Sequence, residues 1–287
     1  MKKVLVLGGT RFFGVHLVEA LLNEGIEVTV ATRGNTAHVF SKKVNHMVID
    51  RSSLLADKEK LQSEKWDVVF DQICYASRDA LDAVEVFNGH TKKYVLTSSK
   101  SVYEGKELSK EEDFIPEKHS IVMGTKENFT YAEGKRQAEA VFFQHAEFPV
   151  AAVRPPIVIG EHDYTNRLKY YVGKIMSGDE FHLVNSDAYI DFISEEEIGQ
   201  FLAWIGLSTF TGAVNATSHG KIKLQDLVHL IEAETGKEAS ISLNPIEGEN
   251  SPYNLSKTWL MSNERAKSLG YSFQDLHDYL PKLLKKL

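Results

Sequence analysis

The sequence is short of the features that mark secreted, membrane and metal-binding proteins. Cys74 is the single cysteine among 287 residues, so no disulfide can form within the chain, and no metal-ligating residues adjoin it in the sequence. A reducing compartment fits this usage, and we expect no metal site. Apolar runs are much shorter than a membrane span requires. The start Met-Lys-Lys leads directly into a predicted strand instead of a cleavable signal, so we expect a cytoplasmic protein with no membrane partner.

Positive charge is also in deficit. The formal net charge is −7 at pH 7, which opposes general attraction to nucleic acids and anionic membrane surfaces. No internal repeat or low-complexity stretch is present, and a hydrophobic content of 43% is ordinary for a folded chain. The composition favours a globular protein whose partner is a small molecule, and we expect no nucleic-acid partner.

What the sequence does have is a regular alternation of strand-like and helix-like segments through its first half. Alternation of this kind is typical of an α/β fold, with a Rossmann-type doubly wound parallel sheet. The predicted strands are 3–7, 27–31, 45–49, 68–72, 93–97, 150–154 and 213–215. The predicted helices are 13–24, 78–88, 130–145 and 195–204.

The first predicted strand and the turn after it favour dinucleotide binding. The four apolar residues at 4–7 predict a strand buried on both faces, and Gly8, Gly9 and Gly14 allow a sharp turn into a helix. Unpaired backbone N–H groups and the helix dipole favour a pyrophosphate at such a helix start. A tight turn that binds no nucleotide is the alternative. The predicted cofactor residues of this turn are Gly8, Thr10, Arg11, Phe12, Phe13 and Gly14.

The second predicted strand leads into Thr32 and Arg33, without the acidic residue that accepts hydrogen bonds from the ribose of NAD. A carboxylate there would repel the extra phosphate of NADP, whereas a guanidinium binds it with two hydrogen bonds. Arg11 is a candidate for a second such contact, so the sequence favours NADP over NAD. The alternative is that either arginine, Arg11 or Arg33, is only a charged surface residue. After the third strand, Asp50 is a candidate acceptor for the adenine amino group or a turn residue, and Arg51 joins the predicted cofactor set.

Hydroxyl residues gather at the end of the fifth predicted strand, Thr97-Ser98-Ser99, where ligands lie in open α/β sheets. Further along, Tyr131 and Lys135 are four residues apart, which puts both side chains on one helix face. An ammonium beside a phenol stabilises the phenolate, so the tyrosine can exchange a proton with a carbinol near neutral pH. The same spacing occurs at 170/174 and 253/257, but only the first pair follows the serine strand and precedes the next core strand.

Together these motifs resemble an extended short-chain dehydrogenase/reductase of the NAD-dependent epimerase/dehydratase family, over nearly the whole chain. The resemblance implies that Tyr131 is the acid/base and that Ser99 binds the substrate oxygen. It also implies that Lys135 holds the nicotinamide ribose and that Pro155 contributes to the cofactor site. The motifs that carry it are Gly8-Gly9-Thr10-Arg11-Phe12-Phe13-Gly14, Thr97-Ser98-Ser99 with Val102-Tyr103, Tyr131-x-x-x-Lys135, and Arg154-Pro155-Pro156 with Gly160.

The resemblance also implies two lobes with the substrate between them. A dinucleotide-binding domain would comprise 1–156 plus 187–219, and a smaller C-terminal α/β substrate-binding lobe 157–186 plus 220–287. Arg11 replaces the middle glycine of the family's usual fingerprint, and an arginine here accompanies NADP in the shorter reductases of the superfamily. Lys100-Ser101 follow Ser99 where the dehydratases carry Asp-Glu, which argues against dehydration.

The implied activity is hydride transfer at a carbinol or carbonyl carbon, as an oxidoreductase or as an isomerase of the epimerase kind, with a nucleotide sugar as one candidate substrate. A regulator that senses NADP without turnover is one alternative. An RNA-binding protein is another, because chloroplast stem-loop-binding proteins are similar in the glycine turn but lack the tyrosine–lysine pair. The intact Tyr131 and Lys135 favour an enzyme. A homodimer formed through the helices at 78–88 and 130–145 is also expected, as in many extended family members.

Overall fold

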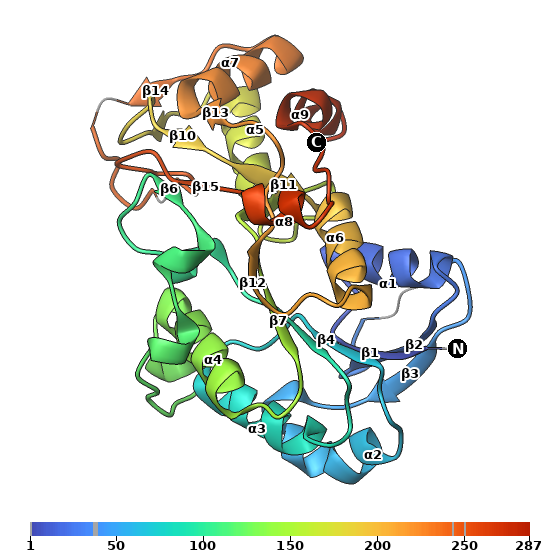
Figure 1. Cartoon of the computed structure of the whole chain (residues 1–287). Helices are drawn as coiled ribbons and strands as arrows, with labels where there is room; N and C mark the ends of the chain where they lie inside the picture. Colours follow the sequence, from blue (N-terminus) through green and yellow to red (C-terminus); the bar gives the residue numbers. More distant parts are fainter. Residues whose placement is uncertain (1, 37–39, 243, 250) are drawn as a thin grey trace. The chain divides into compact units, whose positions relative to one another are not determined.

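The computed structural model of the chain describes residues 2–36, 40–242, 244–249 and 251–287 (Figure 1). The chain divides into two compact units. Unit 1 consists of Met1–Glu104, Glu111–Pro155 and Glu196–Ala216, and unit 2 of Gly105–Lys110, Pro156–Glu195 and Thr217–Leu287. Segments 105–110 and 187–195 thus lie in unit 2, whereas the sequence predicts them in the first domain. The reason is strand pairing, since both segments form strands with partners in unit 2.

Unit 1 is built on a seven-stranded sheet in the order β12-β7-β5-β4-β1-β2-β3, and every neighbouring pair is parallel. The chain builds one half of the sheet outward from β1 and the other outward from β4. These two central strands therefore flank the point where the strand order reverses, where ligands bind in such sheets. The predicted doubly wound parallel sheet is confirmed. The strands are β1 (Lys3–Leu7), β2 (Glu27–Thr32), β3 (Asn45–Val48), β4 (Val68–Asp71), β5 (Tyr94–Thr97), β7 (Val150–Arg154) and β12 (Gly212–Asn215).

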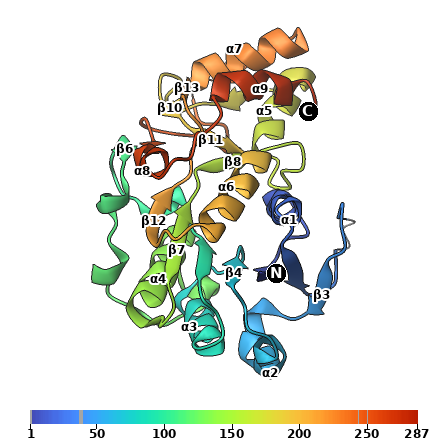
Figure 2. The same cartoon turned by 45° about the vertical axis from the view of Figure 1, so that its right-hand side comes forward.

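Helices cover both faces of this sheet. In both views α1 and α6 lie on one face, and α2, α3 and α4 lie on the other (Figures 1 and 2). Leu17, Val18 and Leu21 belong to the buried stripe of α1, and Gly25, just beyond the C-cap residue of this helix, has a positive φ of 72°. The helices are α1 (Phe13–Asn23), α2 (Lys58–Gln62), α3 (Ser77–Phe87), α4 (Tyr131–His145) and α6 (Glu195–Leu207). Short 3₁₀ segments lie at Arg51–Asp57, which is kinked at Ser53, and at Lys100–Val102, Glu111–Asp113, Pro116–Lys118 and Lys126–Asn128.

The segment 114–128 crosses the outer side of α4. Gln144 Nε2 donates to Pro116 O at 2.9 Å and to His119 O at 2.8 Å, and Gln137 Oε1 accepts from Val122 N at 2.8 Å. Unit 1 therefore covers part of its own α4 surface. Ala140, which lies in the helix through which the sequence predicts a homodimer, is fully buried.

In its described part, unit 2 combines short strands with three longer helices and one short helix. Its core centres on Tyr171, whose ring stacks on Tyr253 with centroids 5.1 Å apart. The strands are β6 (Leu108–Ser109), β8 (Ile157–Ile159), β9 (Phe181–His182), β10 (Tyr189–Ile190), β11 (Phe192–Ser194), β13 (Ile222–Lys223), β14 (Ile241–Ser242) and β15 (Leu260–Met261). The helices are α5 (Arg167–Ser177), α7 (Leu224–Thr235), α8 (Glu264–Ser268) and α9 (Leu276–Leu284), with the first residue of α6. In the ranges that the structure describes, no helix is both long and apolar enough to cross a membrane.

Candidate active site

The turn between β1 and α1 is packed so closely that side chains are excluded from it. Gly8 and Gly9 have φ values of +101° and +97°, which favour glycine. A Cβ on Gly14 would lie 2.8 Å from the Cα of Gly9. No side chain caps the first turn of α1 among the described residues. The N–H groups of Gly14 and Val15 donate to Arg11 O and Phe12 O at 3.1 and 3.0 Å, and the helix dipole favours an anion at this uncapped start.

Residues predicted for the adenosine end of a cofactor lie on two adjacent strands. Thr32 ends β2, and its Oγ1 accepts from Gly34 N at 3.2 Å, while the next residue, Arg33, is exposed. Asp50 follows β3, and its Oδ1 accepts from Ser52 N and Ser52 Oγ at 3.0 and 2.7 Å. The hydroxyl and then the backbone N–H of Ser52 lower the pKa of Asp50, and Arg33 lowers it further. Arg33 and Asp50 therefore share one charged edge of unit 1.

Arg51, the last residue predicted for this end of the cofactor, is held inside unit 1. Its guanidinium is buried, and Nε and Nη2 donate to Oδ2 of Asp71 at 3.0 and 2.7 Å. The hydroxyl of Tyr94 donates to the same oxygen at 2.7 Å. The guanidinium of Arg51 is thus bound to a buried carboxylate from β4, and cofactor binding by Arg51 stays a prediction.

The predicted catalytic residues come from the end of β5 and the start of α4. Lys135 is buried, and its Nζ donates to the carbonyls of Cys74 and Thr97 at 2.7 and 2.9 Å, which ties α4 to the ends of β4 and β5. Tyr131, one helical turn earlier, is 55% exposed, and its ring centroid lies 5.9 Å from Lys135 Nζ. Ser99 Oγ accepts from Ser101 N at 3.1 Å. The structure therefore brings an exposed phenol and a buried ammonium together at the strand end that leads into Ser99.

Sequence reasoning missed Tyr75, which lies beside both members of this pair. Its ring centroid is 4.6 Å from Lys135 Nζ and 6.5 Å from the ring centroid of Tyr131. A Cβ on Gly134 would lie 2.3 Å from the backbone oxygen of Tyr75, so position 134 admits only glycine without rearrangement. The loop after β4 therefore packs directly on α4 between Tyr131 and Lys135. The sequence signal that could have indicated Tyr75 is its position just after a predicted central strand, because ligands lie at the carboxyl ends of parallel strands.

Cys74 precedes Tyr75 and acts here through its backbone oxygen. Its side chain is fully buried, and burial raises the pKa of the thiol. Because the thiolate is the nucleophilic form of cysteine, this residue is not equipped for covalent catalysis.

A buried ionic network holds α4, which carries the predicted catalytic residues, to the neighbouring strands. Arg154, at the end of β7, donates from Nε and Nη2 to the two carboxylate oxygens of Glu139 on α4, at 3.0 and 2.6 Å. Its Nη1 donates to the hydroxyl of Tyr103 at 2.9 Å, and Ser98 Oγ donates to Glu139. Burial opposes the charge on Arg154, but Glu139 raises the pKa of the guanidinium above its usual value. The network joins α4, β5 and β7 at the level of the predicted site.

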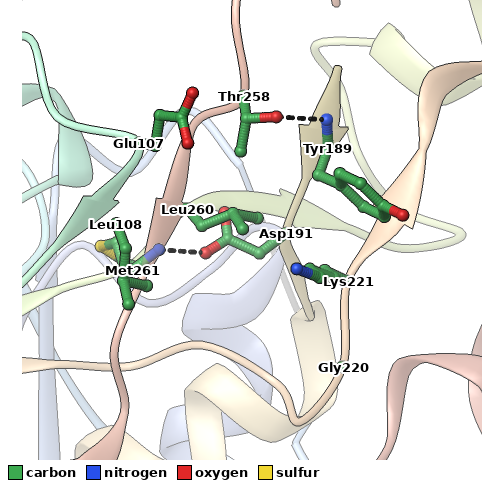
Figure 3. Close-up of a pocket in the computed structure, with 9 residues that line it drawn as sticks. All are labelled: Glu107, Leu108, Tyr189, Asp191, Gly220, Lys221, Thr258, Leu260 and Met261. Carbon is green, nitrogen blue, oxygen red and sulfur yellow. Dashed lines mark hydrogen bonds between the residues drawn. The ribbon is translucent and has the colours of Figure 1, made fainter. Parts of the chain in front are cut away.

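Unit 2 contains a cavity of about 590 Å³ (Figure 3). Two hydrogen bonds frame it, from Tyr189 N to Thr258 Oγ1 at 3.1 Å and from Met261 N to Asp191 Oδ2 at 2.7 Å. Lys221 Nζ lies 4.5 Å from the ring centroid of Tyr189. The volume suits a small molecule. The lining residues are Glu107, Leu108, Tyr189, Asp191, Gly220, Lys221, Thr258, Leu260 and Met261.

Comparison with known proteins supports the family resemblance. Residues 4–77 match the sequence model of the NAD dependent epimerase/dehydratase family. One curated relative, the chloroplast stem-loop binding protein of 41 kDa b from Arabidopsis thaliana, is 26% identical over 204 residues, which cover 66% of this chain. The matched region covers 50% of that relative, so the chain spans about half of its length. The family resemblance predicted from the motifs is confirmed.

Solved structures match the fold over almost the whole chain. MoeE5 in complex with UDP-glucose and NAD gives a TM-score of 0.76 at 18% identity, covering 99% of this chain and 98% of that one. The UDP-glucose 4-epimerase of Thermus thermophilus, in complex with NAD, gives a TM-score of 0.72 at 16% identity, covering 99% and 96%. These matches establish the Rossmann-type α/β fold.

Proposed function

We propose that this chain, whose residues 4–77 match the sequence model of the NAD dependent epimerase/dehydratase family, is an enzyme of this family that transfers a hydride between a nicotinamide cofactor and a carbinol or carbonyl carbon. The observation that carries the proposal is the exposed phenol of Tyr131 beside the buried ammonium of Lys135, at the end of β5. Tyr131 exchanges the hydroxyl proton of the substrate, and Ser99 donates a hydrogen bond to the same oxygen. The cofactor, when bound, supplies or accepts the hydride.

The residues at the glycine turn fit a dinucleotide. Side chains at Gly9 and Gly14 would clash with protein neighbours, since their Cβ atoms would meet them at 3.0 Å or less, so the turn keeps a bare backbone. The first turn of α1 has no side-chain cap among the described residues, and the helix dipole favours an anion there. Lys135 keeps one ammonium hydrogen beyond the two that it donates to carbonyls, which suits a ribose hydroxyl.

We expect NADPH to bind roughly ten- to a hundredfold more tightly than NADH, because Arg33 offers an exposed guanidinium at the end of β2 and no acid stands there. Fluorescence titration of both reduced cofactors measures the two affinities. Arg33→Ala should remove most of the difference by weakening NADPH binding alone. Arg78→Ala, at another exposed arginine of unit 1, should change neither affinity. Equal affinities in the parent protein would contradict the NADP preference.

A screen of carbonyl compounds and nucleotide sugars tests the activity itself. Nucleotide sugars belong in the screen because the family and the UDP-glucose complex of MoeE5 point to them as substrates to try. A reductase consumes NADPH in proportion to product, whereas an epimerase interconverts two stereoisomers with no net change in cofactor absorbance. Tight cofactor binding without turnover of any substrate would favour the alternative of an NADP-sensing regulator. We also propose that the protein resides in the cytoplasm.

RNA binding is a second candidate, because the Arabidopsis relative is named for a stem-loop. The net charge of −7 opposes it, and the tyrosine–lysine pair has no role in it. Gel-shift titration with a stem-loop RNA, at a salt concentration of roughly 0.15 M, distinguishes the two. Submicromolar binding that depends on a basic surface would favour this candidate over the enzyme.

We further propose a homodimer that forms through α3 and α4. Ala132 and Phe143 on α4 keep part of their surface exposed, although Ala140 is buried and segment 114–128 covers part of the helix. Light scattering at micromolar concentration should give the mass of a dimer, and Phe143→Glu should shift it towards the monomer because the charge would be buried in the contact. A parent protein that stays monomeric would rule out this contact.

A further inference from the structure

The side chain of Gln72 lies against the glycine turn. Gln72 directly follows β4, and its backbone N–H donates to Leu7 O at 3.2 Å, which fixes it beside the end of β1. A Cβ on Gly8 would lie 3.6 Å from Gln72 Cβ, and one on Gly14 would lie 2.6 Å from Gln72 Oε1. The side chain therefore reaches from β4, past the end of β1, to the first turn of α1.

The amide of this side chain is incompletely satisfied. Gln72 Nε2 is buried and has no hydrogen-bond partner in the described part of the chain. A buried amide without an acceptor loses its hydration and gains no bond in exchange, and folded proteins contain few such groups. A leucine would fill nearly the same space without an unsatisfied donor. Glutamine is therefore an unfavourable choice for the cofactor-free protein, and a bound acceptor would account for it.

We infer that Gln72 is a cofactor-binding residue whose side-chain amide donates a hydrogen bond to the pyrophosphate. The inference rests on the proposed cofactor role of the turn. A half-turn about the last side-chain bond exchanges the amide oxygen and nitrogen, so either atom can face the start of α1. The oxygen end lies against Gly14 in the cofactor-free chain. A phosphate at the helix start makes the nitrogen end the favoured one there, because it gives the donor its acceptor.

Two measurements on Gln72→Leu test this role. The affinity for NADPH should fall roughly ten- to a hundredfold, the loss expected for a hydrogen bond to a charged group. The melting temperature of the cofactor-free protein should rise, on the order of 2–4 °C, because the unsatisfied donor is gone. ADP-ribose, which keeps the pyrophosphate and lacks the nicotinamide, should lose affinity by the same factor. Gln72→Glu keeps the shape but presents a carboxylate, so it should weaken NADPH binding more than leucine does.

Gln144→Leu is the matched control, because the amide of Gln144 is satisfied by the carbonyls of Pro116 and His119. It should lower the melting temperature and leave cofactor affinity unchanged. The inference is overturned if Gln72→Leu binds NADPH within twofold of the parent, or if it lowers the melting temperature while Gln72→Glu binds NADPH normally. A parent protein that binds neither NADPH nor NADH overturns the proposed function, and the role of Gln72 with it.

Discussion

Tyr131→Phe is expected to lower turnover by roughly two to four orders of magnitude on any substrate that the screen identifies. The substitution removes only the phenolic oxygen. The ring keeps its position beside Tyr75, and Lys135 keeps its two carbonyl acceptors. The loss should therefore fall on the proton-transfer step, and NADPH affinity, measured by fluorescence titration, should stay within about twofold of the parent.

Tyr170→Phe is the matched control, because the chain repeats the same local geometry in unit 2. Lys174 Nζ lies 5.9 Å from the ring centroid of Tyr170, the distance that separates Lys135 Nζ from the ring of Tyr131. The Tyr170 hydroxyl, however, donates to Glu249, and burial raises the pKa of the phenol. This variant should turn over substrate at the parent rate. Parent-like turnover by Tyr131→Phe would show that the active site has been misassigned.

The three Tyr-x-x-x-Lys pairs show how far spacing alone can predict a site. Two of them lie on helices, in α4 and α5, but the third does not, since Tyr253 is buried in the core of unit 2 while Lys257 Nζ donates to Gly105 O. Spacing specifies only that two side chains share a helix face, if the segment is a helix. The order of motifs along the chain singled out Tyr131. In a doubly wound sheet, the helix that follows the strand before Ser99 packs beside that strand, and Tyr131 lies on this helix.

The centre of the parallel sheet was predictable because its central strands are mostly apolar runs with clear boundaries. β1 and β7 have the predicted bounds; Gly8 ends the first, and Pro149 and Pro155 flank the second. The small strands of unit 2 were not predictable in the same way. A two-residue strand such as β6 carries no periodicity, and it exists because a distant segment, β15, lies beside it.

The contacts of Arg51, Gln72 and Tyr75 were not predicted from the sequence, because each of these residues contacts segments that are distant along the chain. Arg51 is drawn to Asp71, twenty residues away, because a buried carboxylate on β4 needs a cation. Gln72 reaches the glycine turn, and Tyr75 reaches α4, because β4 lies between β1 and β5 in the sheet. The sequence signal for Gln72 and Tyr75 was the presence of polar side chains directly after an apolar central strand. The order of the strands in the sheet decides which neighbour each polar group contacts, and this order cannot be read from a short stretch of sequence.

Replacing Arg154 with methionine should destabilise the protein by about 3–5 kcal/mol, because it leaves the carboxylate of Glu139 buried without a counter-charge. Both side chains are completely buried, and the guanidinium also satisfies the hydroxyl of Tyr103 and the carbonyls of Glu111 and Phe114. Urea unfolding followed by circular dichroism measures the change in the free energy of unfolding.

The exposed pair Lys58–Glu85 provides the contrasting control, since Lys58→Met removes an ion pair that water already screens and should cause no resolvable change. In the double variant Arg154→Met/Glu139→Leu no buried charge is left unpaired, so at least half of the lost stability should return. If Arg154→Met alone unfolds at the parent urea concentration, the pair does not hold α4 to β7. Other contacts, such as those of Lys135 with the backbone oxygens of Cys74 and Thr97, would then hold Tyr131 and Lys135 in position.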